Sequence, residues 1–161
     1  MTSVCRPFAL LAGMVAAVYS FGSVAIALEA IQHWEAFSVS AEGITGNVDI
    51  TGTRMVFENR TVLELSYVGS ASGVVLSAPK DLPAKIYRIT NPQNPILLHG
   101  NTLCSEIPFY VAWVEQSMKP LMEEWNELLL VIIKGREAPR ANMDPNRICS
   151  AFTFTRVVGK H

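Results

Sequence analysis

Regular alternation of apolar and polar residues is the feature that most constrains the fold of this chain. Side chains on a β-strand point alternately to two faces, so a hydrophobic period of two predicts strands with one buried face. Between clusters of proline, this period dominates the chain. The alternation predicts strands at 33–40, 44–51, 54–58, 61–68, 84–90, 109–115 and 149–158, with a further short strand at 74–78 and a strand, turn and short return over 96–104.

These predicted strands are short and follow one another closely, and antiparallel neighbours need only tight turns. A single sheet cannot bury so many apolar faces, so the sheet closes into a small barrel or folds into a sandwich. The predicted class is therefore all-β and mainly antiparallel, with about eight to ten short strands. Half of the residues are apolar and 17% are charged, which excludes a disordered chain.

The segment from Ser117 to Gly135 fits two structures. Apolar residues at helical spacing favour a helix that begins at Ser117 and ends at Gly135. Six consecutive apolar residues from Leu128 favour a strand that is covered on both faces. We predict one short helix near 118–125, followed by a strand over 127–134.

The N-terminus predicts export. A basic residue, Arg6, precedes an uncharged apolar run from Pro7 to Leu28, and this run includes the small-residue pattern of Ala25 to Ala27. This pattern is typical of a secretory signal peptide over 1–27, cleaved after Ala27, and the remaining 28–161 forms one barrel-like domain in the periplasm or outside the cell. A retained membrane helix is the alternative, and it is the only membrane contact that the sequence indicates.

Cleavage would remove Cys5 and leave two cysteines, Cys104 and Cys149, in an oxidising compartment. An even number of cysteines there favours a disulfide. Two buried free thiols and a reactive thiol remain alternatives.

Motifs for chemistry are scarce. His99 lies five residues before Cys104, but a disulfide would remove the thiol that a Cys–His pair requires. Three widely spaced histidines are too few ligands to predict a metal site, and the sequence contains no phosphate-binding loop. We therefore predict no catalytic residues, no metal and no cofactor. The formal net charge of −1 gives no reason to expect nucleic acid as a partner. Asn59 starts an Asn-Arg-Thr sequence, which is a glycosylation pattern as well as a typical turn.

The strings ITGNVDIT, LSYVG, AKIYRITNPQNPILLHGNTLC and NRICSAFTF give a resemblance. Through them the chain resembles small exported bacterial β-proteins of uncharacterised function. The resemblance implies export and a small disulfide-stapled β-fold, and it implies no activity and no site residues.

The leading hypothesis is an exported, non-enzymatic β-barrel binding protein that carries a small apolar ligand, in the manner of a lipocalin. The alternative is a protein-interaction or inhibitor module that acts through its loops and has a filled core. Aromatic residues would line the cavity of a carrier: Trp34, Phe37, Tyr67, Tyr87, Phe109 and Trp113.

Overall fold

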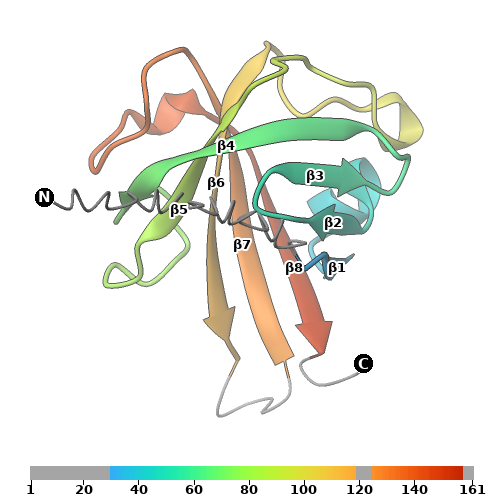
Figure 1. Cartoon of the computed structure of the whole chain (residues 1–161), viewed down its shortest axis with the longest axis horizontal. Helices are drawn as coiled ribbons and strands as arrows, with labels where there is room; N and C mark the ends of the chain where they lie inside the picture. Colours follow the sequence, from blue (N-terminus) through green and yellow to red (C-terminus); the bar gives the residue numbers. More distant parts are fainter. Residues whose placement is uncertain (1–29, 119–124, 158–161) are drawn as a thin grey trace, which may run out of the picture.

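The protein is a closed, eight-stranded antiparallel β-barrel in which every strand pairs with its neighbours in sequence (Figure 1). The computed structural model describes residues 30–118 and 125–157. The all-β class and the closed barrel are confirmed. The strands are β1 (Gln32–Ala36), β2 (Val48–Ile50), β3 (Arg54–Phe57), β4 (Val62–Ala71), β5 (Ala84–Ile89), β6 (Pro108–Ser117), β7 (Trp125–Lys134) and β8 (Ile148–Val157).

Pairing between β8 and β1 closes the barrel, and this seam is short. Only Glu35 with Thr155 and Ala36 with Phe154 are in register. Beyond Ala36 the chain leaves the strand, and the hydroxyl of Ser38 accepts the N–H of Thr153. The backbone N–H groups of Phe37 and Ser38 also donate to the Thr153 carbonyl, at 3.0 and 3.1 Å, so the seam continues for two residues beyond β1.

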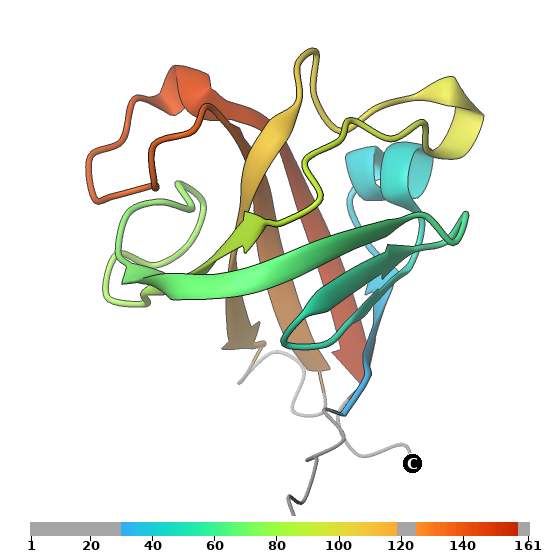
Figure 2. The ribbon, with the colours of Figure 1, turned by 45° about the horizontal axis from the view of Figure 1, so that its top comes forward.

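Successive strands run in opposite directions, so their connections alternate between the two ends of the barrel (Figure 2). One end carries the connections 37–47, 58–61, 90–107 and 135–147; we call it the disulfide end, because Cys104 and Cys149 lie there. The other end carries 51–53 and 72–83 and receives the first residues of β1 and the last of β8; we call it the Arg156 end.

Alternation along each strand separates an inner and an outer apolar cluster. The inner core contains Trp34, Met55, Phe57, Phe152 and Phe154, with exposed fractions of 0–3%. The outer cluster covers β5, β6 and β7 on their outer face. Its members are Ala84, Ile86, Tyr110, Ala112, Val114, Leu129, Val131 and Ile133, together with Val74 and Val75 from the connection 72–83.

The two clusters explain the apolar run in β7. Leu128, Leu130 and Ile132 point inward, whereas Leu129, Val131 and Ile133 point into the outer cluster. A strand buried on both faces was predicted here, and it is confirmed, although it begins at Trp125 rather than at Glu127. The short helix predicted near 118–125 falls mostly outside the described residues, and Trp125 itself lies in the strand.

Four predicted strands differ from the structure. The strand predicted over 33–40 ends at Ala36, and the strand and return predicted over 96–104 are reduced to an isolated bridge between Ile96 and Thr102 around a 3₁₀ turn. The sequence predicts a strand over 44–51, but Ala41–Thr45 form a π-helical turn, η1, and only Val48–Ile50 remain extended. Gly46, with φ of 60°, makes the sharp exit from η1, and an added Cβ would meet the side chain of Glu58. The stretch 74–78 is a turn and not a strand, because Val74 and Val75 are buried by folding back onto the outer face.

Candidate functional site

Three of the six aromatic residues expected to line a cavity lie together in the inner core. These are Trp34, Tyr87 and Trp113, with exposed fractions of 0%, 7% and 6%. The rings of Tyr87 and Trp113 stack with their centroids 4.1 Å apart, and Tyr67 meets Tyr87 edge-on at 5.4 Å. Tyr67 is 56% exposed. We call Tyr67, Tyr87 and Trp113 the aromatic trio.

The other two predicted lining residues lie elsewhere. Phe37 follows β1 at the disulfide end, and 57% of it is exposed. Phe109 packs against the outer cluster, where the guanidinium of Arg136 lies 5.4 Å from the centre of its ring. The structure therefore does not bring all six aromatic residues around one space.

Side chains of the inner core have little contact with solvent. Trp34, Met55 and Phe154 are at most 1% exposed. Small barrels either fill their interior with side chains or hold one small ligand there.

At the Arg156 end, the inner face changes from apolar to polar. Arg156 follows Phe152 and Phe154 on the inward face of β8, and its guanidinium lies 4.5 Å from the centre of the Trp34 ring. Arg156 also pairs with Glu115, whose carboxylate accepts the side-chain amide of Asn126 at 3.0 Å. This arrangement links β1, β6, β7 and β8 through a cation–π contact and an ion pair.

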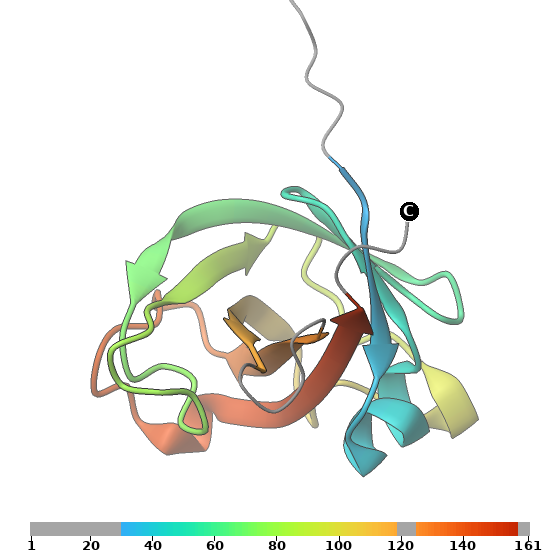
Figure 3. The same ribbon diagram turned by 90° about the horizontal axis from the view of Figure 1, so that it is seen from below.

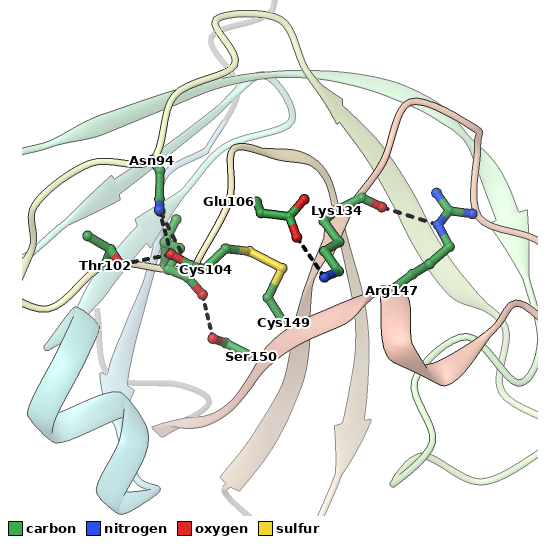
Figure 4. Close-up of a disulfide and its surroundings, with 9 residues drawn as sticks. Asn94, Thr102, Cys104, Glu106, Lys134, Arg147, Cys149 and Ser150 are labelled. Atoms are coloured by element: carbon green, nitrogen blue, oxygen red, sulfur yellow. Dashed lines mark hydrogen bonds and ion pairs between the residues drawn. A yellow bond between two sulfur atoms is a disulfide. The ribbon is translucent and has the colours of Figure 1, made fainter.

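At the disulfide end, Cys104 and Cys149 form a disulfide with a Cα–Cα distance of 5.1 Å (Figure 4). The predicted pairing is therefore confirmed. Asn94 brackets Cys104: its side-chain oxygen accepts the Cys104 N–H at 3.2 Å, and its amide donates to the Cys104 carbonyl. Ser150 donates its hydroxyl to the carbonyl of Leu103, so the connection 90–107 is fixed to β8 by this hydrogen bond as well as by the disulfide.

Asparagine and arginine side chains fix the remaining connections at this end. Asn59 donates to the Ile96 carbonyl at 3.0 Å, and Asn101 donates to the Gly43 carbonyl at 2.9 Å. Arg147 donates to the carbonyls of Lys134 and Glu137. The connections 37–47, 58–61 and 90–107 are thus tied to one another by side chains, and Arg147 ties the connection 135–147 to itself and to the end of β7. Sequence reasoning assigned these asparagines to turns and did not identify them as cross-links between loops.

These fixed connections also carry large apolar side chains that face solvent. We call this set the loop surface: Phe37, Val39, Ile96 and Ile107, with exposed fractions of 57%, 86%, 71% and 49%. The alternation of 33–40 predicted Phe37 and Val39 to lie on one face of a strand. The strand instead ends at Ala36, which leaves both side chains outside the core.

The residues considered for chemistry stay apart. Cys104 is bonded to Cys149, so His99 has no thiol beside it, and His99 lies in a 3₁₀ turn, η2 (Leu98–Gly100), with φ of 54°. The Nδ1 atom of His33 lies 2.7 Å from a carboxylate oxygen of Asp49, and both side chains are exposed. Among the described residues, no three histidine, cysteine or carboxylate side chains are grouped to hold a metal ion. The absence of an enzymatic activity stays a prediction.

Asn59 has both ends of its side-chain amide engaged. Its nitrogen donates to Ile96, and its oxygen accepts the N–H of Thr61 at 3.0 Å. The turn interpretation of this Asn-Arg-Thr sequence therefore has a structural basis, because an asparagine that bonds to its own backbone two residues on stabilises a turn.

Comparison of the chain with protein-family models, with curated proteins and with solved structures finds no match. The resemblance to small exported bacterial β-proteins therefore stays a prediction. No helix within residues 30–118 and 125–157 has the length and apolar character to cross a membrane. The predicted signal peptide, 1–27, lies outside the described residues. The disulfide indicates an oxidising, extracytoplasmic environment.

Proposed function

We propose that the protein is an exported, non-enzymatic interaction module that binds a protein partner through the loop surface at its disulfide end. The observation that carries this proposal is the burial of the large inward-facing side chains, of which Trp34, Met55 and Phe154 are at most 1% exposed. A barrel whose own side chains occupy its centre acts through its surface.

Pre-organisation of the loops supports the proposal. A flexible loop loses conformational entropy when it binds, and a loop that is already fixed avoids most of this cost. The connection 90–107 is held by the disulfide, by Asn94 and by Ser150, and the neighbouring loops are held by Asn59 and Asn101. Binding residues are often found on loops that a rigid scaffold positions in this way.

Exposed apolar residues on these loops supply the contact chemistry. Val39 and Ile96 are 86% and 71% exposed, and burying such a side chain contributes roughly 1.5–3 kcal/mol. Single exposed apolar residues are ordinary on a protein surface. Their position on fixed loops at one end of the barrel, however, is what an interaction surface requires.

Site-specific photo-crosslinking in the producing cells tests this proposal. A photoreactive residue is placed at Val39, at Ile96 or, as a control on the outer wall of β5, at Arg88, which is also exposed. We expect one shared adduct mass from the two loop positions and none from Arg88. Adducts from Arg88 alone, or no adduct at either loop position, would contradict the proposal.

A second candidate function is supported by the aromatic trio. Tyr67 is 56% exposed and meets the nearly buried stack of Tyr87 and Trp113, so an apolar ligand could bind against its ring at the rim of the barrel rather than inside it. Titration with an apolar fluorescent naphthylamine probe tests this candidate. Saturable binding that is lost in Tyr67→Ser and kept in Phe37→Ser would favour it, and unchanged binding in Tyr67→Ser would dismiss it.

A further inference from the structure

The strand β4 is much longer than the strand beside it. It spans ten residues, whereas β3 spans four and pairs with β4 only over Val62–Glu64. The backbone N–H of Leu65 still reaches the carbonyl of Thr53, at the tip of the β2–β3 hairpin, at 2.7 Å. Beyond Leu65 the hairpin has ended, and in Figure 1 the green ribbon of β4 continues past β3.

The backbone N–H and C=O groups of successive residues in β4 point alternately toward β3 and toward β5, and this shows which of them lie at the edge beyond β3. Leu65 bonds toward β3, and the carbonyl of Glu64 accepts a bond from Thr90 on the β5 side. The backbone groups of Tyr67 therefore also point toward β3, where no strand of the described chain is present. One extra residue in β4 shifts the register between Tyr67 and Gly69. Ser70, which pairs with Lys85, is therefore the next residue whose backbone N–H and C=O groups point away from β5.

We propose that this free edge of β4, residues 66–71, binds an extended strand of a partner polypeptide by adding it to the sheet. Unpaired N–H and C=O groups along a strand edge are complementary to another strand, and this form of recognition is common in peptide-binding domains. This proposal concerns a different surface from the loop surface and does not depend on it.

The side chains beside the edge define the partner further. Tyr67 and Val68 are 56% and 48% exposed, and they present apolar surface to a docked strand. No charged residue occurs from Leu65 to Pro79, so the edge lacks the lysines that often protect exposed strands.

Lys85 adds a charge preference. It is exposed and directly opposite Ser70 on β5, and among the described residues it forms no ion pair. It alternates with Tyr87 and Ile89, which places it on the inner face of the sheet. The docked strand is therefore an apolar one with an acidic side chain on the same face as Lys85.

Amide hydrogen exchange tests the edge directly. In the free protein, we expect the N–H of Ser66, which points to β5, to exchange slowly and the N–H groups of Tyr67 and Ser70 to exchange quickly. The probe is a capped octapeptide of alternating valine and threonine with one glutamate. It is expected to slow exchange at Tyr67 and Ser70 and to leave the loop surface unchanged.

Reversing the charge at Lys85 tests the charge preference and leaves the backbone of the edge unchanged. Lys85→Glu is expected to weaken binding of the glutamate peptide roughly fivefold and to restore it for a peptide with lysine in place of glutamate. Arg140→Glu, an exposed residue in the connection 135–147 at the disulfide end, makes the same change of charge away from β4; it is the control and should change neither. The proposal is overturned if Tyr67 is already protected in the dilute free protein, or if the peptide protects no β4 amide. It is also overturned if rising protein concentration alone protects the edge, since a second copy would then be the occupant.

Discussion

The two ends of the barrel are closed by different chemistry. At the disulfide end, long loops fold over an apolar core and are fixed by a covalent bond and by asparagine side chains. At the Arg156 end, the connections 51–53 and 72–83 join β2 to β3 and β4 to β5, and Arg156, Glu115 and Asn126 continue the inward face of the strands. Figure 3 views the barrel from below the orientation of Figure 1, with β1 and β8 side by side at the seam.

This difference separates two sources of stability. A disulfide that closes a separation of 45 residues restricts the unfolded chain by about 4 kcal/mol on the chain-entropy model. The ion pair at the other end joins side chains that are 27% and 26% exposed, where solvent screens the attraction. We therefore expect the disulfide end to dominate stability and the Arg156 end to contribute less.

Removal of the disulfide should have the largest effect. Cys104→Ser with Cys149→Ser is expected to lower the free energy of unfolding by about 2–5 kcal/mol, because the unfolded chain regains its entropy. Denaturant unfolding with and without reductant measures the change. The reductant should destabilise the native protein and leave the double variant unaffected; equal sensitivity in both would contradict the comparison.

Breaking the closure at the Arg156 end should have a smaller effect. Arg156→Met keeps the length of the side chain but removes the ion pair and the cation–π contact, and we expect a loss of about 1–2 kcal/mol. Thermal unfolding of this variant, of Glu115→Gln and of the double variant gives the coupling between the two charges. A loss larger than that of the cysteine double variant would reverse the proposed ranking of the two ends.

Loss of the hydrogen bonds between Asn94 and Cys104 should lower the free energy of unfolding by a similar amount. Asn94→Ala leaves the N–H and C=O groups of Cys104 without their side-chain partners, and we expect a loss of about 1–2 kcal/mol. Asn94→Asp is informative beside it, because the carboxylate keeps the acceptor and loses the donor. If both variants are as stable as the native protein, the asparagine does not fix the loop.

An exposed ion pair on the barrel wall should have the smallest effect. Arg54 and Glu64 lie 3.2 Å apart, and both side chains are about half exposed, so Arg54→Gln is expected to cost less than about 1 kcal/mol. The measured value, taken at low and high salt, sets the scale of an ordinary surface pair. The loss of stability in Arg156→Met must exceed the loss in Arg54→Gln if the contacts of Arg156 contribute more than an ordinary surface ion pair.

Much of the barrel was predictable from local patterns. Strict alternation located β3 to β6 and β8, and counting cysteines after the predicted cleavage identified the disulfide. The apolar run from Leu128 indicated a strand buried on both faces, because neither a surface strand nor an amphipathic helix needs six such residues in succession.

Other features depend on contacts that no local pattern contains. The alternation of 44–51 is as regular as that of a strand, yet Ala41–Thr45 form a π-helical turn. The Ser38 hydroxyl accepts the N–H of Ala41, and the Ala41 carbonyl accepts the N–H of Gly46, where the chain changes direction. Phe37 is exposed because β1 ends one residue before it. Phe109 packs against the outer cluster because the register of β6 shifts between Pro108 and Tyr110. The free edge of β4 arises from a mismatch in strand length, which only the paired structure shows.

Native mass spectrometry of the protein, purified without detergent from the cells that produce it, tests the central claim most directly. A filled barrel with a closed disulfide predicts a chain that carries no small-molecule adduct and is two hydrogens lighter than its reduced form. A stoichiometric adduct of lipid size, retained until the protein unfolds, would contradict the filled interior and restore the carrier hypothesis.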